Sequence, residues 1–165
     1  MKGIIIMGSS RSDGDTAAVA KELATLTDFE VLDLNSIEFS DYDYQSRNSG
    51  DDFLPTVRRI VTDFDHIIWL TPVYWYSMSA LMKRFIDRIS DCLRIEKDTG
   101  RKFRGMSMSL VSVSNDVRNE GFDTPFKLTA EYLGMNYLGD QHVIVSQDHD
   151  INKQLSATVR RLKNC

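Results

Sequence analysis

The chain has 165 residues, of which 42% are hydrophobic and 27% charged, and its formal net charge is -4. These values are typical of a globular protein, and they argue against nucleic-acid binding through bulk positive charge. No run of about 18 or more apolar residues is present, so we expect no membrane-spanning helix. Cys92 and Cys165 lie far apart and form no Cys-x-x-Cys motif. We therefore expect no disulfide framework, no metal site and a cytoplasmic setting.

Segments typical of strands and helices alternate along the chain. Short apolar runs predict strands, and apolar residues at helical spacing predict the helices between them. In chain order we expect a strand over residues 2–7, a helix over 16–26, a strand over 29–34, a helix over 53–64 and a strand over 65–71. An amphipathic helix over 78–89, a strand over 106–113, a helix over 122–133, a strand over 137–146 and a helix over 152–163 follow.

This alternation predicts the fold class. Five strand–helix units without a Pro/Gly/Ser-rich linker indicate one α/β domain over residues 1–165 with a parallel sheet. Five units are too few for a barrel of eight. We therefore expect a doubly wound sandwich with strand order 2-1-3-4-5 and helices on both faces of the sheet. Ligands in such sheets bind beyond the carboxyl ends of the strands at the switch point, which lies here between the first and third strands.

The loop after the first strand has the composition of an anion-binding turn. It contains Gly8, Ser9, Ser10, Arg11, Ser12, Asp13, Gly14, Asp15 and Thr16. Free backbone N–H groups and the helix dipole favour a negative charge at such a strand-to-helix turn, and hydroxyls with one Arg suit a phosphate monoester. The alternative is a plain polar turn in which Asp13 or Asp15 caps the helix.

Two other nucleotide-binding motifs fit this loop poorly. A P-loop would need a Gly-Lys-Ser/Thr sequence, which is missing after Gly8. A dinucleotide motif would need glycine where Ser10 and Asp13 stand. Asp33, at the end of the second strand, has the place of a ribose-binding acid, but strand-end acids more commonly cap a turn.

The loop after the third strand is aromatic. It contains Pro72, Val73, Tyr74, Trp75, Tyr76 and Ser77. Ordinary core or interface packing is the commoner role of aromatic residues, yet three consecutive rings cannot all face one core. We expect at least one ring at the crevice or at a subunit interface, and Ser77 as the N-cap of the following helix. A phosphate site beside a planar aromatic site outlines flavin mononucleotide (FMN).

Residues 8–16 and 72–88 together closely resemble the flavodoxin-like NAD(P)H-dependent FMN reductases, in an element order that covers most of the chain. The resemblance implies a flavodoxin-like fold, FMN phosphate held by residues 9–16, and the isoalloxazine along residues 72–77. It also implies that Ser114 and Asn115, in the loop after the fourth strand, close the other edge of the ring. Asn115 could instead be a plain turn residue. Iron–sulfur relatives carry a cysteine cluster where residues 38–52 of this chain have no cysteine, which excludes such a cluster.

The resemblance further implies an FMN-dependent oxidoreductase that passes electrons from NADPH or NADH to a flavin, a quinone or a similar small acceptor. Flavin carries the electron chemistry itself, so we assign no catalytic residue. We expect His66, His142 and His149 to be structural or surface residues, and Cys92 to be a small buried hydrophobic residue.

Two alternatives stay open. One is a flavodoxin-type electron carrier, although carriers usually dock through a strongly acidic face and a net charge of -4 is modest. The other is a flavin-binding fold that has lost its chemistry.

Family members are usually homodimers or tetramers. Lys83, Arg84 and Arg88 beside apolar positions of the third helix are typical of a subunit interface rather than of an acidic docking ring. Three rings at the start of this helix leave more aromatic surface than one domain edge readily buries. We therefore expect a homodimer in which the 74–76 loops lie near the interface and each helps to wall the partner's flavin. We expect no nucleic-acid or membrane partner.

Overall fold

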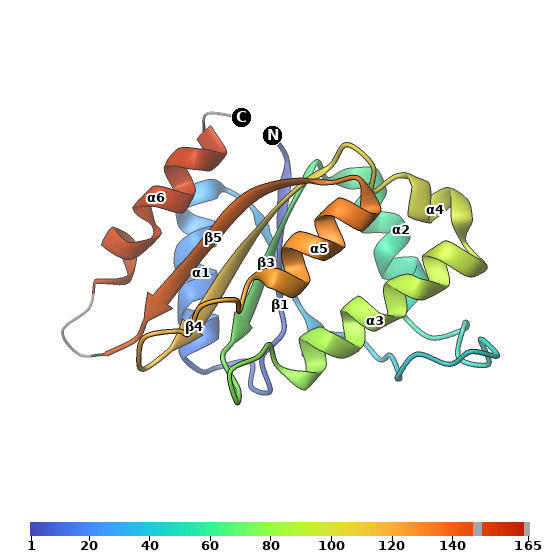
Figure 1. Ribbon diagram of the computed structural model, residues 1–165, viewed down its shortest axis with the longest axis horizontal. Coiled ribbons are helices and arrows are strands. Elements are labelled where there is room, and N and C mark those ends of the chain that lie inside the picture. The colour runs from blue at the N-terminus through green and yellow to red at the C-terminus, as the bar shows by residue number, and fades with distance from the viewer. Residues whose placement is uncertain (147–149, 164–165) are drawn as a thin grey trace.

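The computed structural model describes residues 1–146 and 150–163, so His149 and Cys165 lie outside the described residues. Its strands form one five-stranded sheet in the order β2-β1-β3-β4-β5, and all neighbouring pairs are parallel (Figure 1). The strands are β1 (Gly3–Met7), β2 (Glu30–Asp33), β3 (His66–Pro72), β4 (Ser107–Ser114) and β5 (Asn136–Ile144). This order confirms the doubly wound, flavodoxin-like fold that the sequence predicts.

Helices cover both faces of the sheet. They are α1 (Asp15–Thr27), α2 (Phe53–Asp63), α3 (Ala80–Arg94), α5 (Thr124–Leu133) and α6 (Ile151–Lys163). In Figure 1, α1 and α6 lie on one face of the sheet, and α2, α3 and α5 on the other. Two short elements were not expected, the 3₁₀ turn η1 (Leu34–Ser36) and the helix α4 (Lys97–Arg101). Both are too short to show an apolar period in the sequence.

The core consists of two apolar layers on the two faces of the sheet. In β1, Ile4 and Ile6 pack into the layer of α2, α3 and α5, whereas Ile5 and Met7 pack into the layer of α1 and α6. Every residue of this strand is buried. A strand buried on both faces reads as a continuous apolar run, which is why the sequence predicts it well.

The expected N-cap of α3 is wrong. Ser79, and not Ser77, caps this helix, because its Oγ accepts a hydrogen bond from the backbone N of Met82 at 3.0 Å. Ser77 belongs instead to a tight turn, in which the backbone N and O of Tyr74 and Ser77 pair at 2.9 and 3.0 Å. The turn uses Ser77 before the helix begins at Ala80.

Arg88 is also placed differently from the expectation. Its side chain is fully buried, so it cannot contribute a charge to a subunit interface. Its Nε donates to Asp91 Oδ2 at 2.8 Å and its Nη1 to Asp51 Oδ2 at 2.6 Å. Nη1 also donates to the backbone O of Ser40, and the guanidinium lies 4.7 Å from the centre of the Phe53 ring. Arg88 thereby holds the segment 38–52, which follows η1, against α3.

Candidate functional site

The loops after β1 and β3 are tied together by buried hydrogen bonds. Gly8 N donates to Leu70 O at 2.9 Å, and Ser79 Oγ donates to Gly8 O at 2.5 Å. The Thr71 hydroxyl accepts from Ser79 N at 3.0 Å. A Cβ on Gly8 would lie 2.8 Å from the Cβ of Met82, so only glycine allows this approach to α3. Our sequence reasoning missed the roles of Thr71 and Ser79, because no local pattern marks a partner so distant in the chain.

The loop after β1 forms a cradle of unpaired backbone donors. Helix α1 begins at Asp15 behind the N-cap Gly14, and no side chain caps it, so neither Asp13 nor Asp15 has the alternative role of a cap. Among the residues that the structure describes, none accepts a hydrogen bond from the backbone N–H groups of residues 12–16. Such a helix start attracts anions.

Side chains complete the cradle. Thr16 is only 4% exposed, and Ser9 is also buried. The Arg11 guanidinium lies over Gly14, because a Cβ there would be 2.8 Å from its Nη2. Two hydroxyls, one cation and free N–H groups thus face the same space, which is the donor set that a phosphate monoester requires.

A cleft of about 220 Å³ joins the three predicted loops. Ten of the predicted site residues line it, namely Ser9, Arg11, Gly14, Asp15, Thr16, Pro72, Val73, Tyr74, Ser114 and Asn115. Val113 and Val145 add an apolar wall that we did not predict. Ser12, Asp13, Trp75, Tyr76 and Ser77 do not line this cleft, and Ser12 instead borders a groove between α1 and β2.

The aromatic loop presents its rings in two ways. The Tyr74 hydroxyl lies 2.8 Å from Ser10 Oγ, so this side chain connects the aromatic loop to the loop after β1. Trp75 and Tyr76 are 90% and 71% exposed. Their φ angles are 48° and 65°, in the left-handed region that non-glycine residues rarely adopt. The turn therefore holds both rings outward at a conformational cost.

The loop after β4 is braced by His142. The Asp116 carbonyl can only accept, so His142 Nε2, 2.8 Å away, carries a proton. Nδ1 then accepts from the Ser112 hydroxyl at 2.9 Å in the neutral ring. The Asn115 side chain has no hydrogen-bond partner within the described part of the chain, which leaves its amide available to a ligand.

Asn35 is a further residue that the sequence did not reveal. Its Nδ2 donates to the backbone O of Ser9 at 2.7 Å, and its backbone N donates to Asp33 Oδ1 at 2.9 Å. Asp33 therefore caps the turn η1, which is the commoner of its two possible roles. Asn35 holds the backbone of Ser9 at the start of the loop after β1.

Within residues 1–146 and 150–163, no group of three or more His, Cys, Asp or Glu side chains is placed to hold a metal ion. In the same residues, none of the helices has the length and apolar character needed to cross a membrane.

The sequence model of one protein family, described as NADPH-dependent FMN reductase, matches residues 1–150. The chain belongs to this family. The reductase is therefore an oxidoreductase with FMN and NAD(P)H as its cofactors, and both expectations are confirmed.

Relatives agree with this assignment. The reductase is 26% identical to the putative NAD(P)H-dependent FMN-containing oxidoreductase YwqN of Bacillus subtilis, over 99% of this chain and 97% of the relative. It matches the structure of Trp repressor binding protein from Bacillus subtilis with a TM-score of 0.77 and 26% identity, over 99% of both chains. General stress protein 14 from Treponema denticola, solved in complex with FMN, shares the fold at 18% identity with a TM-score of 0.66, over 99% of this chain and 97% of that one.

Proposed function

We propose that the reductase binds FMN with its phosphate in the cradle of residues 9–16 and its ring system beside Val73, Tyr74 and Asn115. One observation carries this proposal. Free N–H groups at the start of α1, the buried Thr16 hydroxyl and the Arg11 guanidinium face the same cleft that the aromatic loop borders. Asp13 and Asp15 would contribute through their backbone N–H groups, since carboxylates repel a phosphate.

The electron acceptor is proposed to be a flavin, a quinone or a similar small planar molecule. FMN supplies the electron chemistry when it is bound, and the protein supplies binding, orientation and exclusion of water. Among the described residues that line the cleft, there is no histidine or cysteine. We propose that the residues lining the cleft act by binding FMN and orienting the two substrates against it. A relative named NADPH azoreductase, 29% identical over 59% of this chain, supports small aromatic acceptors.

The reductase is also proposed to act in the cytoplasm as a homodimer. Cys92 is a free, buried thiol, which fits a reducing compartment. Trp75 and Tyr76 leave a large aromatic surface exposed at the edge of the sheet. Exposed apolar surface of this kind usually marks a contact, and two-fold dimers are the commonest assembly.

The cofactor proposal is tested by flavin titration. The purified protein is expected to bind FMN more tightly than riboflavin, because riboflavin lacks the phosphate that the cradle holds. Flavin fluorescence quenching measures both affinities. Equal affinity for the two flavins would overturn the phosphate assignment.

Anaerobic mixing of the FMN-loaded protein with NADPH or NADH tests the activity. Bleaching of the flavin absorbance, followed by reoxidation with a quinone, is expected. A protein that binds FMN tightly but is not reduced by either nicotinamide would instead fit the flavodoxin-type carrier.

A further inference from the structure

Polar side chains join the loop after β4 to the edge strand β5. Figure 1 shows this loop leaving the end of β4 beside β5 and leading to α5. Ser112 and His142 stand opposite each other in the register of the two strands, and Asp140 lies two residues before His142 on the same face of β5. Leu110 precedes Ser112 on that face of β4 and packs into the layer of α5. The apolar layer therefore gives way to polar residues where β4 approaches the cleft.

A chain of hydrogen bonds with a fixed direction connects Arg118 to the start of this loop. Arg118 Nη1 donates to Ser112 Oγ at 3.0 Å. This oxygen lies 2.9 Å from His142 Nδ1, and His142 Nε2 lies 2.8 Å from the backbone O of Asp116. A guanidinium can only donate and a carbonyl can only accept, so the two ends set the direction of the bonds between them. Ser112 therefore donates to Nδ1, and His142 donates from Nε2.

Arg118 is itself held in place on β5. Its Nη2 pairs with a carboxylate oxygen of Asp140, and its guanidinium lies 5.1 Å from the centre of the Phe122 ring. The Arg118 side chain is 14% exposed, and Ser112 is fully buried. Buried polar groups need their partners, so the loss of one member leaves the next without its hydrogen bond. The chain of bonds therefore depends on Arg118.

Asn115 lies between two residues that this chain holds. Ser114 Oγ donates to the backbone O of Asp116 at 2.6 Å, and His142 Nε2 lies 3.1 Å from the same Oγ. The backbone on both sides of Asn115 is thus tied to β5, whereas the Asn115 side chain lines the cleft. A group held in its binding position before the ligand arrives loses less conformational entropy on binding.

We propose that Arg118 is a positioning residue for flavin binding, which acts through Ser112 and His142 on the loop that carries Asn115. The inference rests on the proposed function, because it takes the ring system of FMN to lie beside Asn115. Arg118 does not line the cleft, so its effect on the flavin passes through the loop. Loss of Arg118 frees the Asn115 amide, and flavin affinity falls because the amide must then be ordered on binding.

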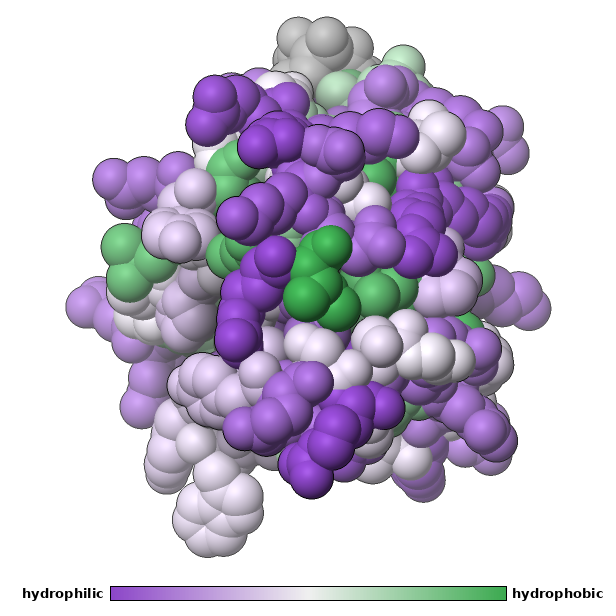
Figure 2. All heavy atoms as spheres, turned by 90° about the vertical axis from the view of Figure 1, so that its right-hand side faces the viewer, coloured by the Kyte–Doolittle hydropathy of each residue, from purple (hydrophilic) through white to green (hydrophobic). Residues whose placement is uncertain are grey.

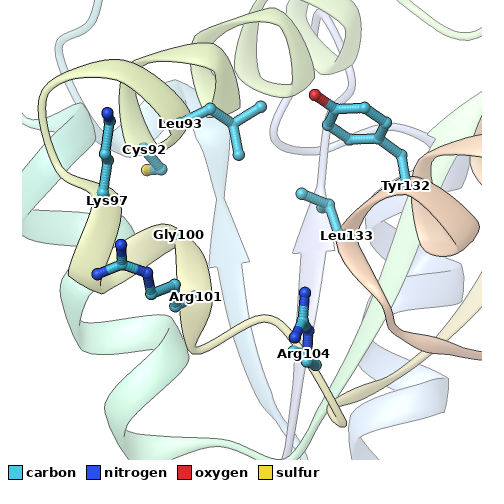
Figure 3. A pocket seen from close by; sticks show the side chains of 8 residues that line it. All are labelled: Cys92, Leu93, Lys97, Gly100, Arg101, Arg104, Tyr132 and Leu133. Carbon is cyan, nitrogen blue, oxygen red and sulfur yellow. The ribbon is translucent and has the colours of Figure 1, made fainter.

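The matched control for Arg118 is Arg104, an exposed arginine that precedes β4 at the opposite end of the strand. Figure 2 faces the end of the molecule that carries α4, where mainly hydrophilic side chains surround a small hydrophobic patch. Figure 3 shows Arg104 beside a pocket of about 230 Å³ that α3, α4 and α5 also line. The eight residues of β4 span roughly 26 Å, so a change at Arg104 removes an arginine without reaching the cleft.

A double-mutant cycle tests whether Arg118 acts through Asn115. Arg118→Leu and Asn115→Ala are each expected to weaken FMN binding about three- to tenfold, as for one lost hydrogen bond. The double variant is expected to bind FMN no more weakly than Arg118→Leu alone, because the amide is already out of position. Fluorescence titration measures the four affinities. Losses that multiply, or an Asn115→Ala variant that binds FMN as tightly as the wild type, would overturn the proposal.

Comparison of FMN with riboflavin separates this effect from one on the phosphate cradle. Arg118→Leu is expected to weaken the binding of both flavins by the same factor, because they share the ring system that the loop borders. Arg104→Leu should leave both affinities unchanged. Arg118→Lys keeps a cation and a donor at this position and should retain most of the affinity. A loss confined to FMN in Arg118→Leu would place its effect at the phosphate and contradict the proposal.

A measurement without flavin tests the hydrogen-bond chain separately from the proposed function. In protein with isotope-labelled histidine, the Nε2 proton of His142 is expected to exchange slowly with water and to give an imidazole N–H signal in the NMR spectrum. His142→Gln assigns the signal by removing it. Arg118→Leu and Ser112→Ala are both expected to abolish the signal, whereas Arg104→Leu should keep it.

Ser112→Ala leaves no charge unpaired, so it replaces Arg118→Leu in all of these measurements if the latter variant does not fold. A His142 signal that survives both changes, or that is missing from the wild type, would overturn the chain of bonds. A wild-type protein that shows the signal but binds no flavin would instead overturn the proposed function.

Discussion

Arg11 is the single cation among the described residues that line the cleft between the loops after β1, β3 and β4, and it lies over Gly14 at the start of α1. Asp13 and Asp15 stand in the same loop, so the side-chain charge of the loop does not by itself favour a phosphate. In the proposed binding mode the guanidinium would offset these carboxylates and donate hydrogen bonds to the phosphate oxygens. The contribution of Arg11 to the free energy of FMN binding should therefore depend on both its charge and its hydrogen-bond geometry.

We expect Arg11→Ala to weaken FMN binding by about 1–3 kcal/mol, the range for a lost charge-assisted hydrogen bond. The salt dependence of binding should also decrease, because one charge contact is lost. Fluorescence titration at several salt concentrations measures both effects. Riboflavin affinity should stay the same, and Lys153→Ala on α6 is the control for loss of a surface charge. Unchanged FMN affinity would show that the phosphate does not bind beside Arg11.

Thr16 tests the hydroxyl part of the cradle. Thr16→Ala removes a buried hydroxyl and should weaken FMN binding by about 1–3 kcal/mol, whereas Thr16→Ser keeps the hydroxyl and should retain most of the affinity. Titration of both variants with FMN separates the hydrogen bond from the packing of the methyl group. Equal losses in the two variants would show that only packing matters.

At the scale of elements, the N-cap residue of α3 connects the loops after β1 and β3. Ser79 caps the helix and donates to the buried carbonyl of Gly8, while its backbone N reaches Thr71. Hydrogen bonds of Ser79 therefore link the start of α3, the end of β3 and the loop after β1.

Ser79→Ala should destabilise the protein by about 2–3 kcal/mol, since it removes the cap and leaves the Gly8 carbonyl without a partner. Ser77→Ala is the matched control, and it should change stability by less than about 0.5 kcal/mol because Ser77 is exposed. Urea unfolding measures both. A larger loss of stability in Ser77→Ala than in Ser79→Ala would indicate that Ser77 is the N-cap, as the sequence predicts.

The second contact of α3 is with the segment 38–52, through Arg88. Burial raises the pKa of Asp51, but hydrogen bonds from Arg88 and backbone N–H groups outweigh this effect and leave the pKa below its usual value. Asp91 Oδ1 has no hydrogen-bond partner within residues 1–146 and 150–163, so Asp91 depends on Arg88 for compensation of its charge.

Arg88→Met should destabilise the protein by about 3–5 kcal/mol, because a buried carboxylate loses its cation. Adding Asp91→Asn to this variant should restore part of the stability by removing the charge. The control is Arg84→Met, which breaks an exposed pair with Asp41 and should cost less than about 1 kcal/mol. Urea unfolding compares the three variants, and equal losses for Arg84→Met and Arg88→Met would contradict this view of the segment.

At the scale of the whole molecule, burial also affects the charge state of His66 at the start of β3. It pairs in register with Gly3 and Ser107, and its ring lies 6.0 Å from that of Phe29. Neither ring nitrogen has a hydrogen-bond partner in the described part of the chain. Burial lowers its pKa to about 4, from an ordinary value of 6.5. Between these two values the unfolded chain binds a proton that the folded chain does not bind.

Stability should consequently fall as the pH drops from about 6.5 toward 4, by about 3 kcal/mol over the whole window. His66→Leu cannot bind the proton and should remove most of this dependence. Carboxylates whose pKa is lowered, such as Glu96 and Asp51, also lose their stabilisation as the pH falls, so the difference between wild type and His66→Leu is what reports on His66. Urea unfolding at about pH 7 and pH 4.5 provides the measurement. An equally steep pH dependence in the variant would assign it to other groups.

The sequence by itself determined the strand order, the helix positions and ten residues of the cleft. Strands buried on both faces read as apolar runs, and the strand order brings the loops after β1 and β3 to one switch point. The strand order and the eight cleft residues in the loops after β1 and β3 follow from local pattern and chain topology, whereas Ser114 and Asn115 were implied by the family resemblance.

Only the tertiary structure decided which serine caps α3, that Arg88 is buried, and that Trp75 and Tyr76 point outward. In the first two cases the deciding partner lies far along the chain, as Gly8 does for Ser79 and Asp51 for Arg88. The outward direction of the Trp75 and Tyr76 rings is decided by left-handed backbone angles, which residues of these types rarely adopt. Hydrogen-bond partners and strained turns depend on how distant segments pack, and local sequence propensity does not predict that packing.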